Sequence, residues 1–143
     1  MICADTSFLL SLAGNDSNSA SAVAHAKTLG GPIVITALIR LEFENAVALL
    51  RFRGAMPEAE ANDATTAFAA DEAAGRITEA MCDWPGVMTE AVRISRARTR
   101  QEGHRLLDIL HVAAALRMGG KEFLSFDQRQ RELATAEGLT VRP

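Results

Sequence analysis

The chain has 143 residues, of which 48% are hydrophobic, a length that suits one domain over 1–143 with a proper core and is too short for two. Its net charge of −3 argues against a protein that holds nucleic acid through a general positive field. Because it has no apolar run of about 18 residues, no secretion leader and no cysteines beyond Cys3 and Cys82, we expect a cytoplasmic protein rather than an exported or membrane-inserted one.

Strand and helix signals alternate along the chain. Short apolar runs indicate strands, and apolar positions every three or four residues between capping residues and glycines indicate helices. In chain order we expect a strand over 2–4 followed by a helix, a helix over 20–29, a strand over 32–36, helices over 37–53 and 57–74, a short edge strand within 76–82, helices over 85–100 and 106–118, a strand over 122–126, a helix over 128–137 and a strand over 139–141. This alternation predicts an α/β domain whose parallel sheet carries helices on both faces.

The charges are unevenly distributed, with acidic residues concentrated in 58–79 and arginines in 93–105. A charge run of this kind is usually a solvated helix face, and a rim that contacts phosphates is the alternative. Because Tyr is absent and Trp84 is the only Trp, the composition gives little basis for a base-stacking platform. The basic stretch comprises Arg93, Arg96, Arg98, Arg100 and Arg105.

Two aspartates follow predicted strands. Asp5 ends the first strand, and Asp127 ends the strand over 122–126 just before a helix, where it could also act as the N-cap. In an open α/β sheet, ligands bind at the carboxyl ends of the strands. If the two strands are neighbours, both acids therefore lie on one rim.

Two more acids lie in predicted helices. In the helix over 37–53, Glu42 and Asn45 fall on the apolar stripe, so Glu42 is expected to point inward, whereas Glu44 is rotated away. A buried acid of this kind is either paired or bound to a metal. The apolar residues of the stripe are Leu38, Leu41, Leu49 and Phe52.

Asp108 lies in the first turn of a helix that is otherwise apolar. An acid there can simply complement the helix dipole, but it is the only acid in a helix that must be buried on most sides. His111 stands one turn further on. It could be a metal ligand, a phosphate donor or a hydrogen-bonded core histidine, of which the last is the commonest.

Converging carboxylates repel one another, and a divalent cation relieves that repulsion. Oxygen-only ligands suit Mg²⁺ or Mn²⁺, whereas zinc prefers His and Cys. Such an ion lowers the pKa of a bound water and neutralises charge on a phosphodiester. The residues thus point to metal-dependent phosphodiester hydrolysis.

The chain resembles PIN-domain ribonucleases of the VapC toxin type. The resemblance covers essentially the whole chain and rests on four acidic motifs in order, of which a short Asp-Thr-Ser start is weak alone. The motifs are DTS at 5–7, LEFENA at 41–46, LDILHVAAA at 107–115 and FLSFD at 123–127.

This resemblance implies a five-stranded parallel sheet in an α/β/α sandwich and an endoribonuclease that uses Mg²⁺ or Mn²⁺. It further implies a toxin that forms a homodimer, is neutralised by a cognate antitoxin whose tail enters the acidic groove, and meets promoter DNA only through that antitoxin. By the motif match, Asp5, Glu42 and Asp108 would be the principal metal ligands and catalytic acids, with Asp127 weaker or water-mediated. Residues that would support these acids or touch substrate are Thr6, Ser7, Asn45, His111 and Ser125.

Two positions depart from the family pattern. Ser125 replaces the commoner Thr but keeps the hydroxyl, and His111 stands where no second acid follows Asp108. We therefore expect one firmly held ion.

Other classes fit less well. A receiver-type phosphoacceptor domain needs adjacent acids after the first strand and a Lys at a late strand end, but Lys121 precedes its strand. A haloacid-dehalogenase-like phosphatase would have an acid at Ser7. A catalytically silent PIN-like module that binds RNA or protein remains the alternative, because function depends on the site rather than on the fold.

Overall fold

The computed structural model describes the whole chain, from Met1 to Pro143, as alternating strands and helices. The elements are β1 (Ile2–Ala4), α1 (Thr6–Ala13), α2 (Ser19–Ala26), β2 (Ile33–Ile35), α3 (Ala37–Phe52), α4 (Glu58–Ala73), β3 (Ile77–Glu79), α5 (Trp84–Ile94), the π-helical η1 (Ser95–Thr99), α6 (Arg100–Glu102), α7 (Leu106–Arg117), β4 (Glu122–Leu124), α8 (Gln128–Ala136) and β5 (Thr140–Arg142). The predicted α/β/α architecture with a five-stranded parallel sheet is confirmed.

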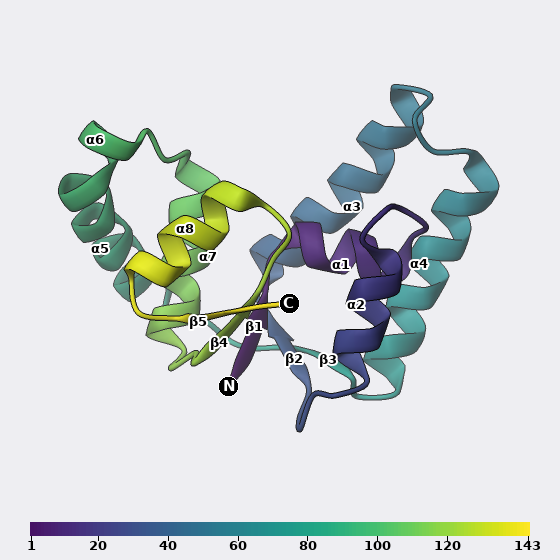
Figure 1. Cartoon of the computed structure of the whole chain (residues 1–143), viewed down its shortest axis with the longest axis horizontal. Coiled ribbons are helices and arrows are strands. Elements are labelled where there is room, and N and C mark those ends of the chain that lie inside the picture. Colours follow the sequence, from purple (N-terminus) through teal and green to yellow (C-terminus); the bar gives the residue numbers. More distant parts are fainter.

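The strands form one parallel sheet in the order β3-β2-β1-β4-β5. The first strand of the chain is therefore the central one, and β3 is an edge strand as predicted. In the pairing of β1 with β4, Cys3 is opposite Phe123 and Ala4 is opposite Leu124. The carboxyl ends of these two strands thus lie side by side, and both point toward the same rim (Figure 1).

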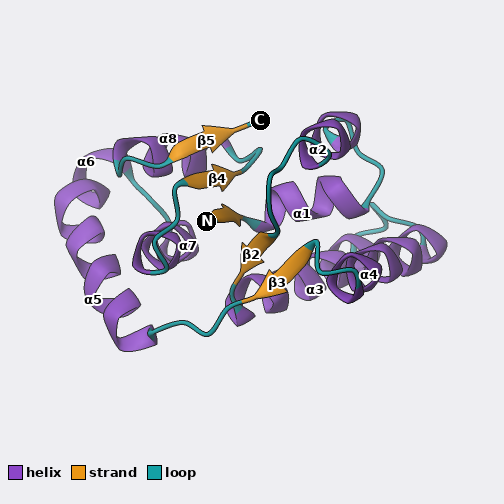
Figure 2. Ribbon diagram, turned by 90° about the horizontal axis from the view of Figure 1, so that it is seen from below, coloured by secondary structure: helices purple, strands orange, loops and turns teal.

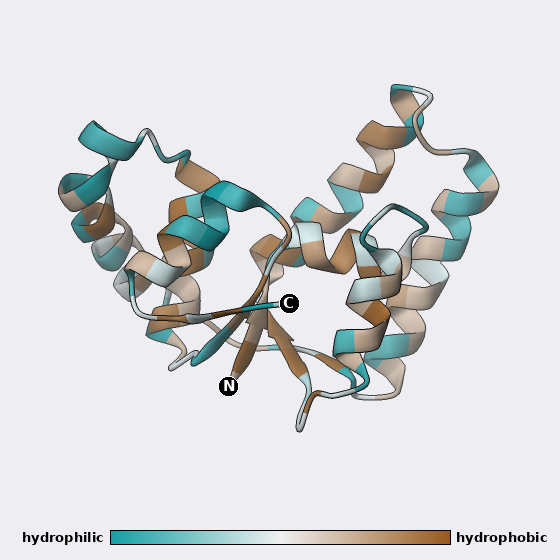
Figure 3. Ribbon diagram, viewed as in Figure 1, coloured by the Kyte–Doolittle hydropathy of each residue, from teal (hydrophilic) through white to brown (hydrophobic).

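Helices cover both faces of the sheet (Figure 2). Side chains alternate between the faces, so that Cys3 and Phe123 pack with α5, α7 and α8, whereas Ala4 and Leu124 pack with α1, α2, α3 and α4. The central strands β1 and β2 are accordingly apolar, whereas the edge strands β3 and β5 carry exposed polar residues, and α8 is largely hydrophilic (Figure 3). None of the helices has the length and hydropathy that crossing a bilayer requires.

The helix predicted over 85–100 is present, but it does not keep α-helical geometry along its whole length. The segment is instead an α-helix that widens into the π-helical η1 before the short α6. Within η1, Arg98 reaches Glu137 at the end of α8. The helix predicted over 20–29 is also shorter, and ends at Ala26.

The prediction of the buried face of α3 was wrong. Leu41 is 65% exposed and Phe52 is 88% exposed, whereas Ile39, Phe43 and Val47 form the face that packs into the core. The helix carries two apolar stripes, and its far end extends beyond the sheet beside α4 (Figure 1). The core uses the stripe that faces α1 and α4, where Phe43 stacks on Phe68.

A charged clasp joins α8 to the α5–η1 segment. The carboxylate of Glu137, whose side chain is only 7% exposed, accepts hydrogen bonds from Arg93 and Arg98, and Arg98 also donates to the carbonyl of Ala136 at 2.6 Å. Burial of Glu137 favours the neutral acid, but these hydrogen bonds outweigh it and hold the pKa of Glu137 below its usual range. The clasp therefore stabilises the fold while Glu137 is ionised.

We expect Glu137→Gln to lower the free energy of unfolding by about 2 kcal/mol at neutral pH, as for other hydrogen bonds to charged groups. Because the folded pKa is depressed, the clasp is fully present above the pKa of an unfolded Glu and is lost as pH falls through the folded value. Urea unfolding at several pH values measures this. Glu132→Gln, at an exposed position of α8, is the control and should change stability little; equal effects of both substitutions would contradict the clasp.

Candidate active site

The rim at the carboxyl ends of β1 and β4 carries two of the predicted acids. The ladder continues past the strands, with the amide of Asp5 donating to the carbonyl of Leu124 at 3.0 Å. This register brings Ser125 opposite Asp5, and its hydroxyl donates to Oδ2 of Asp5 at 2.5 Å. Asp5 is completely buried, and its Oδ1 also caps α1 by accepting from the amide of Phe8 at 3.0 Å.

Ser7 ties the two strand ends together. Its hydroxyl donates to Oδ1 of Asp5 at 2.7 Å and accepts from the amides of Phe126 and Asp127 at 2.9 and 3.1 Å. The amide of Asp127 also donates to the Ser125 hydroxyl at 3.0 Å. Both serines therefore fix the loop after β4 against the end of β1.

Glu42 approaches this rim from the second turn of α3. The helix begins at the end of β2, where the buried Thr36 is its N-cap and accepts from the amide of Ile39 at 3.3 Å. Oε2 of Glu42 accepts a hydrogen bond from the Thr6 hydroxyl and lies 2.7 Å from Nε2 of His111. Although the core stripe was assigned wrongly, Glu42 does point toward the rim, and its side chain is 27% exposed.

Asp108 and Asp127 complete the set. Asp108 lies in the first turn of α7, is 7% exposed, and has a buried Oδ2 that no hydrogen bond reaches. Asp127 is the N-cap of α8, as predicted, and its Oδ1 accepts from the amides of Arg129 and Gln130 at 2.8 and 3.1 Å. Asp5 and Asp127 thus lie at adjoining strand ends, while Glu42 of α3 contacts His111 of α7, one turn after Asp108.

The electrostatics separate these acids into two kinds. Burial raises the pKa of Asp5 despite hydrogen bonds from Ser125, Ser7 and Phe8. Burial, reinforced by the negative charge of Asp127, also raises the pKa of Asp108. In Glu42 the effect of burial is outweighed by hydrogen bonds from His111 and Thr6, which lower its pKa.

The donor set suits a divalent cation chemically. In this structure no three His, Cys, Asp or Glu side chains are close enough together to hold a metal ion, because most of these carboxylates are oriented by hydrogen bonds of their own. The donors are nevertheless all carboxylate oxygens, which Mg²⁺ and Mn²⁺ prefer. The buried Oδ2 of Asp108, which lacks a hydrogen-bond partner, and the raised pKa values of Asp5 and Asp108 are what a cation would relieve.

One residue that the sequence placed at the site, Asn45, has no contact there, and one that contacts the site was not predicted. Asn45 is exposed and makes no side-chain hydrogen bond, so the structure gives it no role at the rim. Sequence analysis missed Arg131, which donates to the carbonyl of Ser125 at 2.6 Å. Its position one helical turn after Asp127 is the only signal that could have revealed it.

The basic stretch divides into two groups. Arg93 and Arg98 are bound in the Glu137 clasp, which supports the structural interpretation for these two. The other arginines, Arg96, Arg100 and Arg105, form no ion pair. Arg105 also lies close enough to Asp108 to oppose the rise in the pKa of that acid.

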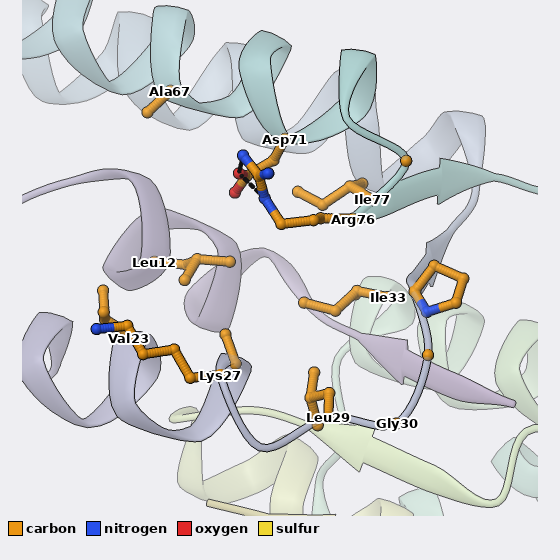
Figure 4. A pocket seen from close by; sticks show the side chains of 14 residues that line it. Leu12, Val23, Lys27, Leu29, Gly30, Ile33, Ala67, Asp71, Arg76 and Ile77 are labelled. Atoms are coloured by element: carbon orange, nitrogen blue, oxygen red, sulfur yellow. Dashed lines mark hydrogen bonds and ion pairs between the residues drawn. The ribbon is translucent and has the colours of Figure 1, made fainter.

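A cavity of about 790 Å³ lies at the opposite edge of the sheet, beside the amino ends of β2 and β3 (Figure 4). Its walls are mainly apolar and include Leu12, Leu29 and Ile33. At the mouth of this cavity, Nε of Arg76 lies 2.7 Å from Oδ1 of Asp71. None of the four rim acids lines this cavity, so it is separate from the candidate site.

The chain is similar to known proteins in both sequence and fold. A sequence model of the family described as PIN domain matches residues 2–136, and no curated protein sequence gives a significant match. Among solved structures, VapC20 of Mycobacterium tuberculosis, described as a sarcin–ricin loop cleaving toxin, has a TM-score of 0.68 at 19% identity, with all of both chains covered.

Two further structures are similar. FitAcB from Neisseria gonorrhoeae has a TM-score of 0.65 at 19% identity, with 100% of this chain and 97% of that chain covered. PAE2754 from Pyrobaculum aerophilum has a TM-score of 0.63 at 15% identity, with 98% and 87% covered. At these identities the likeness shows a common fold.

The burial of Asp5 predicts a measurable effect on stability. A raised folded pKa means that the ionised form destabilises the fold above that pKa, and that this cost vanishes as pH falls below the unfolded pKa. We expect Asp5→Asn, in EDTA at neutral pH, to raise the free energy of unfolding by about 1 kcal/mol, or Tm by about 3 °C. The gain should shrink on acidification.

Thermal unfolding of Asp63→Asn, which changes an exposed aspartate of α4, provides the control and should leave Tm almost unchanged. A lower Tm for Asp5→Asn at neutral pH would mean that the hydrogen bonds of the carboxylate outweigh its burial.

Proposed function

The chain belongs to the PIN domain family, and on that premise we propose that it is a divalent-metal-dependent endoribonuclease that acts as the toxin of a toxin–antitoxin pair. Support for this proposal comes from the placement of the acids: Asp5 and Asp127 lie at the adjoining ends of β1 and β4, Glu42 contacts His111 of α7, and burial and the negative charge of Asp127 raise the pKa of Asp108. Buried acids with raised pKa values are costly for stability, and such cost is typical of functional sites.

We propose that Asp5, Glu42 and Asp108 hold Mg²⁺ or Mn²⁺, with Asp127 in a weaker or water-mediated role. When bound, the ion would supply an acidified water and neutralise charge on the scissile phosphodiester. The chain's own contribution is orientation: Ser7 and Ser125 fix the carboxylate of Asp5. The buried surroundings of Asp5 and Asp108 exclude water, which strengthens electrostatic interactions there.

We propose a structured RNA as the substrate. The similar toxin VapC20 is described as cleaving the sarcin–ricin loop, a statement about that protein which suggests the class of RNA to test first. Three arginines form no ion pair and are available to contact RNA phosphates, namely Arg96, Arg100 and Arg105. Contacts to phosphates need no aromatic residues for base stacking. The RNA and its cleavage site are set by groove shape and loops rather than by the acids.

A cognate antitoxin is the proposed protein partner, and we propose that its tail approaches the acidic rim. The exposed stripe of α3, which includes Leu41 and Phe52, is an apolar surface on the helix that also carries Glu42. Such a surface supports the proposal of a homodimer or of a toxin–antitoxin hetero-oligomer. Promoter DNA would be contacted only through the antitoxin.

The alternative is a catalytically silent PIN-like module that binds RNA or protein. It would need no metal and would tolerate loss of one rim acid. The raised pKa values of Asp5 and Asp108 favour the nuclease, because a surface that only binds RNA or protein gains nothing from buried acids that destabilise the fold.

We expect purified protein to cut end-labelled structured RNA with Mg²⁺ or Mn²⁺ and not with EDTA. Asp5→Asn and Asp108→Asn should each slow cleavage by roughly 100-fold or more, because each removes a charge that stabilises the transition state. Gel assays of initial rates measure this.

Glu44→Gln is the matched control, since Glu44 is an exposed acid only two residues from Glu42. It should cleave at the wild-type rate. Cleavage without metal, or full activity of Asp5→Asn and Asp108→Asn, would contradict the proposal that the chain is a metal-dependent nuclease.

We expect the three unpaired arginines to contribute to RNA affinity. In an Asp108→Asn background that binds without cutting, replacing Arg96, Arg100 and Arg105 with Ala should weaken binding and flatten its salt dependence by roughly 0.7 per lost phosphate contact. Filter binding at several salt concentrations measures the slope. Lys121→Ala, before β4 at the opposite edge, is the control; an unchanged slope in the triple variant would leave these arginines as a solvated face.

A further inference from the structure

The two oxygens of Glu42 have different surroundings. Oε2 is contacted by both the Thr6 hydroxyl and Nε2 of His111, the latter at 2.7 Å. No hydrogen bond reaches Oε1. One oxygen of this carboxylate is therefore occupied by the protein and the other is free.

The ring of His111 is packed in the core, and its one polar contact is with Glu42. His111 lies in the buried stretch of α7, one turn after Asp108, and is 1% exposed. An ionised carboxylate only accepts hydrogen bonds, so Nε2 of His111 carries the hydrogen that it shares with Glu42. Its buried Nδ1 has no partner, so nothing but Glu42 orients the polar edge of this ring.

Thr6 reaches Glu42 from the other direction. It follows Asp5 at the first position of α1, and its side chain is nearly buried. Its single hydroxyl hydrogen points to Oε2 of Glu42. Donors from α1 and α7 thus converge on the same oxygen of an acid from α3.

We propose that His111 and Thr6 are positioning residues that hold Glu42 by Oε2, so that Glu42 offers only Oε1 to the divalent ion. This inference deepens the proposed function and rests on it in one respect, namely that the rim binds a metal. The two donors then determine which oxygen of Glu42 binds the metal.

A carboxylate that offers one oxygen favours some ions over others. Mg²⁺ demands a compact octahedron of single oxygens, and Mn²⁺ serves as its spectroscopic and calorimetric substitute. Ca²⁺ takes more ligands and readily binds both oxygens of a carboxylate. The two donors to Glu42 therefore act as a device that selects the smaller ion.

Calorimetric titration of Mn²⁺ and, separately, of Ca²⁺ into metal-free protein tests this inference. His111→Leu and Thr6→Val, which each remove one donor at nearly constant volume, should weaken Mn²⁺ binding by about 10- to 100-fold, as loss of a group that orients a metal ligand commonly does. Ca²⁺ binding should weaken less, so the preference for Mn²⁺ should fall.

Conservative variants separate positioning from packing. His111→Gln places an amide N–H at the reach of Nε2, and Thr6→Ser keeps the hydroxyl, so both should recover most of the affinity. Ser11→Ala is the matched control: it removes another buried hydroxyl of α1, one that donates to Asp16 at 2.8 Å, and should leave Mn²⁺ affinity unchanged. If His111→Leu fails to fold, Thr6→Val tests the same oxygen through the second donor.

Several results would overturn the inference: no Mn²⁺ binding by the wild type, unchanged affinity and preference in folded donor-deleting variants, or no recovery in the conservative ones. Parallel cleavage assays distinguish this failure from failure of the nuclease proposal. If the wild type binds Mn²⁺ and the variants behave as expected but no RNA is cut, the role of His111 and Thr6 stands and the nuclease proposal falls.

Discussion

The site depends on one costly arrangement, the burial of the Asp5 carboxylate at the end of the central strand. No cation of the protein pairs with it, and it is held by the hydroxyls of Ser7 and Ser125 and by the amide of Phe8. Ser7 and Phe8 reach it locally from α1, whereas Ser125 can reach it only if β1 and β4 are parallel neighbours in the observed register. The strand pairing that makes the hydrophobic core is therefore also the pairing that makes the rim.

The other acids differ because their neighbours differ. Glu42 receives two side-chain donors and is held as a carboxylate, whereas for Asp108 burial and the negative charge of Asp127 outweigh the nearby Arg105 and raise its pKa. Carboxylic acids thus acquire different pKa values from the elements that surround them. A metal-dependent hydrolase can use such a division, because a ligand must be ionised before it binds an ion.

Much of the rim could be predicted from the sequence, because strand ends and caps are local features. Asp5 and Asp127 follow short apolar runs, and the first turn of α7 marks Asp108. Glu42 was found by an argument that was partly wrong, since hydropathy cannot distinguish the core stripe of α3 from its exposed one when both are apolar. The clasp on Glu137 depends on a contact between residues 39 positions apart in sequence, and no local pattern reports such a contact.

The strand order also determines when the rim can exist. During synthesis β1 can pair with β2 early, but its other side stays open until β4 emerges, because Ser125 lies 120 positions after Asp5. At ribosomal speeds that interval is roughly 6 to 24 s. Until β4 is complete, Asp5 has neither its Ser125 donor nor the neighbouring Asp127. A nascent chain therefore carries an incomplete rim until β4 and the start of α8 have been translated.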